Sequence, residues 1–199
     1  SPFTHHKELL RQQIAAKAAK RLNCPVVYLN QVGGNDELIF DGSSFVTDSK
    51  GKIILSLPRC HESISIWDST VEGKDLKQET AEPQEKLLEA LVLGLRDYAA
   101  KCGFNTALLG LSGGIDSALV SVIASAALGP EKVSGVLMPS PWSSEGSIKD
   151  ANKLAQRLGI KTNIIPITRL MASYDKSLEP SLGEIPQGLT AENLQARIR

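Results

Sequence analysis

The stretch Leu109-Gly-Leu-Ser-Gly-Gly-Ile-Asp-Ser117 decides the fold, because it joins a short apolar segment to the start of a long helical pattern. Ala107–Leu111 has the length and composition of a buried strand, and Asp116–Leu128 has those of a helix. Gly113 and Gly114 allow the backbone to turn tightly and to approach a ligand within hydrogen-bonding distance. The first amides of the helix are unpaired donors at the positive end of its dipole. The sequence therefore predicts a phosphate-binding loop between a strand and a helix.

The segments around this loop predict an α/β domain with a parallel sheet. Apolar runs and helical patterns predict strands over Val133–Met138 and Thr162–Ile167, and helices over Glu85–Cys102, Ser147–Leu158 and Thr190–Arg199. Strand–helix–strand–helix–strand at this spacing is typical of a doubly wound, Rossmann-like parallel sheet, in which ligands bind at the carboxyl ends of the strands. Residues Glu179–Gly188 are expected to be irregular.

The loop differs from a Walker A loop, because it has no GxxxxGK[ST] pattern and no lysine. Asp116 occupies its middle instead, and a carboxylate beside phosphates repels them unless a cation bridges the two. The loop therefore implies Mg²⁺, with Ser112 and Ser117 as additional hydroxyl donors. The alternative is a plain turn and helix cap, since Asp and Ser favour helix starts for local reasons. The full pattern between a buried strand and a long helix favours the ligand site.

The first part of the chain has a different pattern, which predicts mostly strands. Its pattern predicts a helix over Lys7–Leu22, strands over Pro25–Asn30, Glu37–Phe40, Ser43–Thr47 and Lys52–Leu57, and hairpin turns at Asp41-Gly42 and Asp48–Gly51. The stretch before the second helix is polar and poor in apolar residues, as linkers are. We therefore assign residues 1–72 to a first domain, 73–84 to a linker and 85–199 to a second domain.

Composition narrows the possible partners. Basic and acidic residues number 22 each, which argues against nucleic acid or an acidic membrane as a partner. There is no signal peptide, and no apolar run approaches the roughly 18 residues of a membrane span, so we expect a cytoplasmic protein. Three cysteines without CxxC spacing predict neither a disulfide framework nor a zinc site. Because the chain begins with Ser1, we expect a piece of something longer.

The loop resembles the PP-loop signature of the ATP pyrophosphatases, adenylating enzymes that split ATP between the α and β phosphates. The resemblance implies that ATP is bound by the whole loop and that Asp116 holds Mg²⁺. The implied ATP-binding residues are Gly110, Leu111, Ser112, Gly113, Gly114, Ile115, Asp116 and Ser117. NAD⁺ synthetases, GMP synthetases, asparagine synthetases and tRNA-modifying ligases share this loop, so the loop alone does not choose among them.

Two later segments select among these families. Val136-Leu-Met-Pro-Ser140, with Ser143, Ser144 and Ser147 after it, resembles a segment that borders the adenine site in glutamine-dependent NAD⁺ synthetases. The resemblance implies that Met138 contacts ATP; otherwise the segment merely ends a strand. In the last predicted helix, Asn193 and Arg197 lie four residues apart and share a face. This helix resembles the E-N-x-x-A-R-x-R helix of NAD⁺ synthetases, which implies that Asn193, Arg197 and Arg199 bind deamido-NAD⁺. The alternative is a solvated, charged face at a chain end.

The first domain resembles the nitrilase-type amidase domain of bacterial NAD⁺ synthetases, through Asn30–Phe45 and Ser1-Pro-Phe-x-x-x-Lys7. The resemblance implies the tail of an α-β-β-α sandwich in which Ser1 and Lys7 help to hold glutamine. It also implies that the catalytic Cys, Glu and Lys lie upstream. None of the cysteines here takes the nucleophile's position, namely Cys24, Cys60 and Cys102.

Together the resemblances imply a ligase that amidates deamido-NAD⁺ to NAD⁺ with glutamine or ammonia. ATP activates the carboxylate as an acyl-adenylate, and the products include AMP, pyrophosphate and glutamate. The implied partners are these small molecules, with no nucleic acid and no membrane, and the implied assembly is a homo-oligomer. Two alternatives stay open: another glutamine-using PP-loop ligase such as a GMP synthetase, and a non-catalytic fragment.

Overall fold

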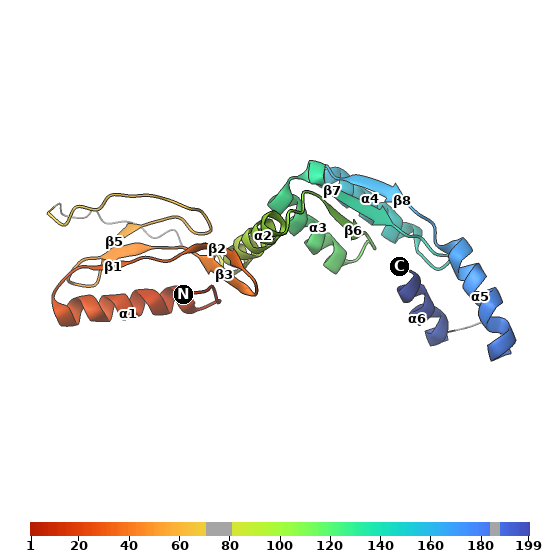
Figure 1. Ribbon diagram of the computed structural model, residues 1–199, viewed down its shortest axis with the longest axis horizontal. Coiled ribbons are helices and arrows are strands. Elements are labelled where there is room, and N and C mark those ends of the chain that lie inside the picture. Colours follow the sequence, from red (N-terminus) through yellow and green to blue (C-terminus); the bar gives the residue numbers. More distant parts are fainter. Residues whose placement is uncertain (71–80, 184–187) are drawn as a thin grey trace. The chain divides into compact units, whose positions relative to one another are not determined.

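A computed structural model describes residues 1–70, 81–183 and 188–199 (Figure 1). The chain divides into two compact units, Ser1–Gly103 and Phe104–Arg199. Among the described residues, no helix is long and apolar enough to cross a membrane.

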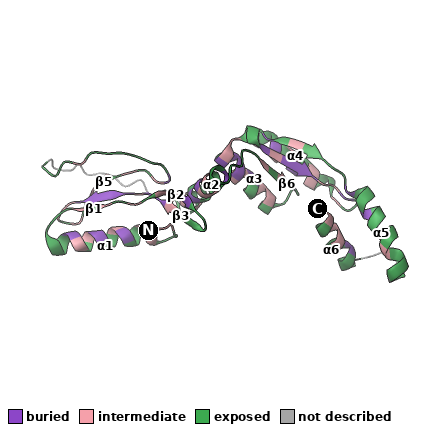
Figure 2. Ribbon diagram, viewed as in Figure 1, coloured by how far each residue is buried: buried purple, intermediate pink, exposed green. Residues whose placement is uncertain are grey.

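The described part of the first unit contains two antiparallel sheets and two helices. Its elements are α1 (Lys7–Leu22), β1 (Val26–Tyr28), β2 (Val32–Asn35), β3 (Leu38–Asp41), β4 (Phe45–Thr47), β5 (Ile53–Ser56) and α2 (Pro83–Cys102). One sheet has the order β1-β4-β5, and the other is the β2-β3 pair. Helix α1, predicted with these same limits, packs on β1 and β4 and buries Arg11, Ala15 and Ala19. Figure 2 shows buried stretches of this helix in purple. Helix α1 ends at Asn23, whose left-handed backbone (φ 51°) terminates the helix.

The turns of the first unit match the sequence prediction in one place and differ in another. The predicted Asp48–Gly51 hairpin is confirmed: it joins β4 to β5, and Asp48 Oδ1 accepts from the amides of Lys50 and Lys52 at 2.9 and 2.7 Å. The predicted hairpin at Asp41-Gly42 is wrong. Gly42 (φ 63°) instead carries the chain from β3 in one sheet to β4 in the other. The partner of β3 is β2, which the sequence hides because its two glycines have low strand propensity.

Helix α2 packs against β2 and β3 through close backbone contact. Gly34 donates its amide to Asp97 Oδ2 at 2.8 Å, and a Cβ on Gly94 would lie 2.8 Å from Ile39 Cδ1. The predicted helix over Glu85–Cys102 is confirmed and begins earlier, at Pro83, after a capping box formed by Glu82 and Glu85. Compactness places α2 in the first unit, while the domain limits 1–72 and 85–199 stay predictions. Most of the predicted linker, residues 73–80, lies outside the described residues.

The second unit is a parallel α/β layer. Its elements are β6 (Ala107–Gly110), α3 (Ile115–Leu128), the 3₁₀ turn η1 (Pro130–Lys132), β7 (Val133–Leu137), α4 (Glu145–Leu158), β8 (Lys161–Ile164), α5 (Thr168–Leu182) and α6 (Gly188–Ile198). The sheet has the order β6-β7-β8, and both pairs are parallel, which confirms the predicted α/β fold class. Helix α3 packs on β6 and β7, and α4 packs on β7, β8 and α3. The core includes Val133 and Leu137 of the central strand.

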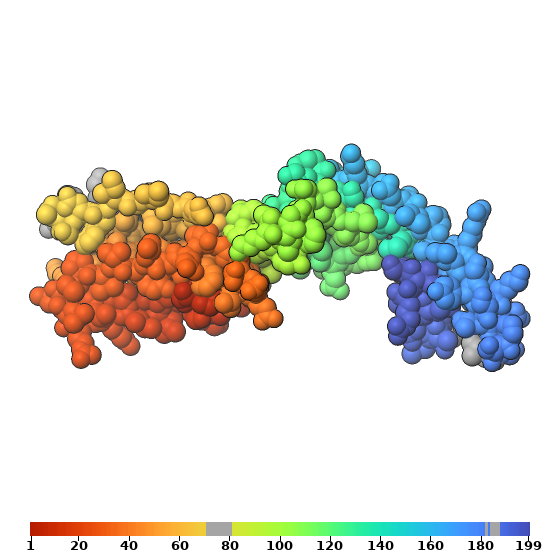
Figure 3. All heavy atoms as spheres, in the orientation of Figure 1, coloured from red at the N-terminus to blue at the C-terminus, as the bar shows by residue number. Residues whose placement is uncertain are grey.

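Helices α5 and α6 contact each other and form the blue end of the chain in Figure 3. The predicted irregular stretch Glu179–Gly188 is wrong at its start, because α5 continues through Pro180 to Leu182. Gly183 (φ 75°) ends α5 and donates its amide to the Glu179 carbonyl at 2.8 Å. Residues 184–187 of that stretch lie outside the described residues.

Candidate functional site

The glycine-rich loop begins where β6 ends, and the residue after β6 anchors it. The Leu111 amide donates to the Val136 carbonyl at 2.8 Å, which continues the pairing of β6 with β7 for one more residue. The Leu111 side chain is buried where Gly135 leaves room, since a Cβ on Gly135 would lie 2.9 Å from Leu111 Cγ. The chain then leaves the sheet and enters α3 at Ile115. The loop therefore lies at the carboxyl end of a parallel strand, where open α/β sheets bind ligands.

Two serines close the loop onto the first turn of α3. Ser112 Oγ and Ser117 Oγ lie 3.0 Å apart, and Ser112 Oγ also accepts from the Gly114 amide at 3.2 Å. Ser117 Oγ donates to the Gly114 carbonyl at 3.0 Å. The cap residue of α3 is a glycine, with no side-chain cap hydrogen bond. The first amides of α3 therefore have neither an intrahelical acceptor nor a capping side chain, and the preformed loop presents them to an anion.

Position 113 in the loop requires glycine. Its backbone has φ 81°, a conformation that side chains disfavour. A Cβ built there would lie 2.9 Å from the carbonyl carbon of Ser147 and closer still to its oxygen. The loop therefore packs directly against the first turn of α4, and any side chain at residue 113 would separate the two.

A run of serines follows the end of β7 and turns the chain into α4. Ser143 Oγ accepts from the Ser140 amide at 2.9 Å, and Ser144 Oγ caps α4 by accepting from the Ser147 amide at 3.1 Å. Arg199, at the end of the chain, donates from Nη2 to Ser143 Oγ at 3.2 Å. These contacts place hydroxyl groups and one guanidinium beside the glycine-rich loop.

A cavity of about 560 Å³ lies between the loop, the end of β7 and the serine run. Its volume is within the range of small-molecule sites, which is roughly 300–1,000 Å³. Polar groups come from Ser112, Ser143 and Arg199, and apolar walls come from Met138 and Trp142. The cavity therefore suits a ligand with one flat apolar part and one anionic part.

The structure brings part of the predicted site together. Five of the predicted residues line this cavity: Gly110, Leu111, Ser112, Met138 and Arg199. Four line a second cavity of about 330 Å³ on the loop, which Leu111 also lines: Gly113, Gly114, Ile115 and Ser117. Asp116, Asn193 and Arg197 are exposed and line neither cavity. Their predicted roles in binding Mg²⁺ and deamido-NAD⁺ stay predictions.

Among the residues that line the cavity, Trp142 and Gln195 were not predicted from the sequence. Trp142, just before the serines of the predicted adenine-site segment, forms part of the wall, and Gln195 of α6 lies one turn before Arg199. The dense run of hydroxyl residues after a strand that ends at the same sheet edge was the available signal. Gln195 had no such signal, because its position depends on how α6 packs.

The residues of the loop are compatible with a magnesium ion that has few protein ligands. Among the described residues, no group of three or more His, Cys, Asp or Glu side chains could hold a metal ion. Mg²⁺ usually keeps several waters and binds one or two carboxylates together with substrate phosphates. Asp116 in the first turn of α3, beside free amides, meets that requirement.

Ser1 and Lys7, predicted to hold glutamine, lie at the two ends of the segment that leads into α1. Ser1 is exposed and Lys7 is half-buried at the first residue of the helix.

Of the cysteines, Cys60 is buried, and burial, followed by the charges of Glu89 and Asp41, raises its pKa to about 11. Its thiol is therefore protonated at neutral pH and is a poor nucleophile.

Two family models match separate stretches of the sequence. The NAD synthase model matches residues 87–199, which is more than half of the chain. The carbon–nitrogen hydrolase model matches residues 4–73. The glycine-rich loop and both cavities therefore lie within the NAD synthase stretch, and the two sheets of the first unit lie within the hydrolase stretch.

Individual relatives match the chain across both stretches. The glutamine-dependent NAD(+) synthetase of Synechocystis sp. is 50% identical, and its alignment covers 100% of this chain and 37% of the relative. That of Acinetobacter baylyi is 40% identical, with 100% and 38% covered. The structure of glutamine-dependent NAD⁺ synthetase from Acinetobacter baumannii, in complex with adenosine diphosphate, is 41% identical with a TM-score of 0.91, covering 100% of this chain and 39% of that one. This chain thus spans less than half the length of the relatives it matches, and it belongs to the NAD synthase family.

Proposed function

We propose that the protein containing this chain converts deamido-NAD⁺ to NAD⁺, with ATP as the activator and glutamine or ammonia as the nitrogen source. The observation that carries the proposal is the preformed loop Ser112–Ser117, packed through Gly113 against α4 beside a cavity of about 560 Å³. The names of the relatives support the same reaction, and one related structure holds adenosine diphosphate.

ATP would bind with its phosphates at the loop and its base in the cavity. Met138 and Trp142 provide apolar surface for the base, and Gly110 approaches the Met138 methyl group so closely that a Cβ there would lie 3.2 Å from it. The amides at the start of α3 would donate to phosphate oxygens as they stand, and the hydroxyls of Ser112 and Ser117 would turn from their present partners to do the same. Donors fixed before the reaction stabilise developing negative charge without reorganising. The loop would thus favour departure of pyrophosphate.

Asp116 would hold Mg²⁺ against the same phosphates. When bound, this ion neutralises charge on the departing pyrophosphate. The role of the chain is to fix the carboxylate in the first turn of α3, next to the amides that bind the phosphates. Without the ion, the carboxylate would repel the phosphates that the amides attract.

The reaction would proceed in two transfers. A carboxylate oxygen of deamido-NAD⁺ attacks the α-phosphorus of ATP, and the bond from that phosphorus to the bridging oxygen breaks to release pyrophosphate. Ammonia then attacks the carbonyl carbon of the acyl-adenylate, loses a proton, and displaces AMP. Adenylation converts a poor leaving group into a good one, which is why an ATP-splitting loop suits amide formation.

Binding of deamido-NAD⁺ would fall to α6. Asn193 and Arg197 are exposed four residues apart on this helix, where they can contact one ligand. Arg199 lies at the cavity and donates to Ser143, so it would meet the substrate where it approaches ATP. Ser1 and Lys7 of the first unit would contact glutamine, whose hydrolysis supplies ammonia. We also propose that the protein forms a homo-oligomer and is located in the cytoplasm.

The experiment is product analysis with the full-length protein. It receives deamido-NAD⁺, Mg·ATP and either glutamine or ammonium, and mass spectrometry measures NAD⁺ and AMP. We expect both products with both nitrogen sources, and none when XMP replaces deamido-NAD⁺. Amidation of XMP, or bound ATP with no NAD⁺ from either source, would reject the proposed substrate.

A further inference from the structure

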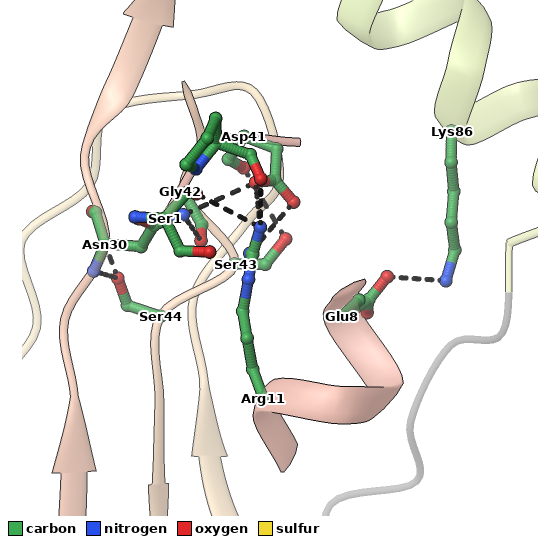
Figure 4. A network of polar contacts seen from close by, with 10 residues as sticks. Ser1, Glu8, Arg11, Asn30, Asp41, Gly42, Ser43, Ser44 and Lys86 are labelled. Atoms are coloured by element: carbon green, nitrogen blue, oxygen red, sulfur yellow. Dashed lines mark hydrogen bonds and ion pairs between the residues drawn. The ribbon is translucent and has the colours of Figure 1, made fainter. Parts of the chain in front are cut away.

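A buried ion pair joins α1 to the end of β3 (Figure 4). Arg11 donates from Nη1 to Asp41 Oδ2 at 3.2 Å and from Nη2 to Asp41 Oδ1 at 2.9 Å. Only 6% of Arg11 and 1% of Asp41 is exposed. This two-pronged contact is the strong form of an Arg–carboxylate interaction.

The same guanidinium holds the chain segment that precedes α1. Arg11 Nη2 also donates to the carbonyl oxygens of Ser1 and Pro2, at 3.1 and 3.3 Å. The Phe3 amide donates to the Ile39 carbonyl at 2.7 Å. Arg11 and strand β3 thus fix the backbone of Ser1–Phe3, which lies outside any helix or strand.

Asn30 completes the network from the other side. Its Nδ2 donates to Asp41 Oδ1 at 3.3 Å and to the Gly42 carbonyl at 3.0 Å (Figure 4). Ser44 Oγ accepts from the backbone amide of Asn30 at 2.9 Å. The carbonyls of Ser1 and Pro2 and the amide of Phe3 therefore all have partners, which fixes the backbone of this segment.

Stability alone is a weak reason for such an arrangement. A buried ion pair loses hydration that its attraction only partly restores, so apolar residues of similar volume stabilise a core equally well or better. What the pair adds is a directional constraint, because a guanidinium donates along fixed directions in one plane. Here those directions end on the carboxylate and on the Ser1–Pro2 backbone.

We propose that Arg11 and Asp41 are positioning residues for glutamine, which they place by fixing the backbone of Ser1–Phe3. The inference rests on the proposed function, in which Ser1 contacts glutamine. The Ser1 carbonyl is held by Arg11, so the Ser1 side chain extends from a fixed point. Glutamine binding therefore depends on a guanidinium that does not touch glutamine.

The test compares two nitrogen sources in the full-length protein. Initial rates of NAD⁺ formation are measured against glutamine and against ammonium for the wild type, Arg11→Lys and Asn30→Ala. Lysine keeps the charge but cannot donate to a carboxylate and two carbonyls in one plane. We expect the KM for glutamine to rise about tenfold or more in both variants, as small displacements of binding groups do. Ammonium-supported kcat should stay within about twofold of the wild type.

Controls separate this role from a structural one. Arg21→Lys makes the same exchange on the same helix at an exposed residue, and it should leave the KM for glutamine unchanged. Equal losses with glutamine and ammonium would mean that the network only supports folding, and an unchanged KM for glutamine would also overturn the inference. If Arg11→Lys does not fold, Asn30→Ala decides, because Asn30 is only half-buried.

Failure of the proposed function would look different. A wild-type protein that makes no NAD⁺ from ammonium would reject the amidation of deamido-NAD⁺. Glutamate release from glutamine would then still report on Arg11 and Asn30. A raised KM for glutamine in that assay would support the positioning role, and an unchanged KM would reject it.

Discussion

The glycine-rich loop and the Arg11–Asp41 network both fix a short piece of backbone, but they do so in opposite ways. The loop is exposed, and its hydroxyl contact joins residues only five apart, Ser112 and Ser117. The network is buried, and its ion pair joins residues 30 apart in sequence. A local arrangement leaves its pattern in consecutive residues, whereas a long-range one exists only after folding. The first could therefore be predicted from sequence and the second could not.

The largest expected effect is the loss of synthesis in Asp116→Ala. Removing this carboxylate takes away the proposed ligand for Mg²⁺, so NAD⁺ formation should fall by about 100-fold or more with either nitrogen source. Asp175→Ala, which removes a carboxylate from α5 in the same unit, should stay within about twofold of the wild type. Rates are measured in the full-length protein. Retained ammonium-dependent synthesis in Asp116→Ala would contradict the role of this residue.

The next effect separates packing from backbone strain. Gly113 and Gly103 both have positive φ (81° and 73°), but a Cβ at Gly113 would meet Ser147, whereas a Cβ at Gly103 would have nothing within 4 Å. Both alanine variants should lose about 1 kcal/mol of stability from backbone strain. Only Gly113→Ala should also weaken ATP binding, by about tenfold or more, because it pushes the loop off α4. Titration calorimetry with Mg·ATP checks this. Equal ATP affinity in the two variants would show that the contact with α4 does not shape the site.

A smaller and more selective effect is expected in the first unit. Lys7→Ala should raise the KM for glutamine by about tenfold and leave ammonium-supported synthesis largely intact, because it removes one charge from a binding site. The matched control is Lys17→Ala, an exposed lysine on the same helix. The measurement is steady-state kinetics with each nitrogen source. A similar loss with both sources would contradict the assignment of Lys7 to glutamine.

The smallest effect concerns the pH dependence of the first unit. Burial raises the pKa of Cys60 from 9.0 to about 11, so the unfolded state ionises first as pH rises. The contribution of this thiol to stability is complete below about pH 9 and is lost as pH rises through about 11. Alkylation by iodoacetamide, followed by mass spectrometry at about pH 8, should modify Cys60 at least about tenfold more slowly than the exposed Cys24. Equal rates would show that Cys60 is accessible and ionised.

Local patterns carried most of what the sequence predicted correctly. The apolar spacing and end signals of α1 predicted its limits, and the alternation of strands and helices predicted the parallel sheet. Errors arose where partners are distant in sequence. Strand β2 carries two glycines and depends on β3 and α2, and the turn at Gly42 could not be distinguished from a hairpin without knowing which sheet each strand joins. At the site, the loop followed from its own residues, while Gln195 reaches the cavity only through the packing of α6.

The most direct test of the central claim follows one oxygen atom. Deamido-NAD⁺ labelled with oxygen-18 in its nicotinate carboxylate is given to the full-length protein with Mg·ATP and ammonium, and AMP is analysed by mass spectrometry. If the loop Ser112–Ser117 directs attack of the carboxylate on the α-phosphorus, one labelled oxygen appears in AMP for each NAD⁺ formed. NAD⁺ accompanied by unlabelled AMP, or by ADP and phosphate, would contradict the acyl-adenylate and with it the function assigned to the loop.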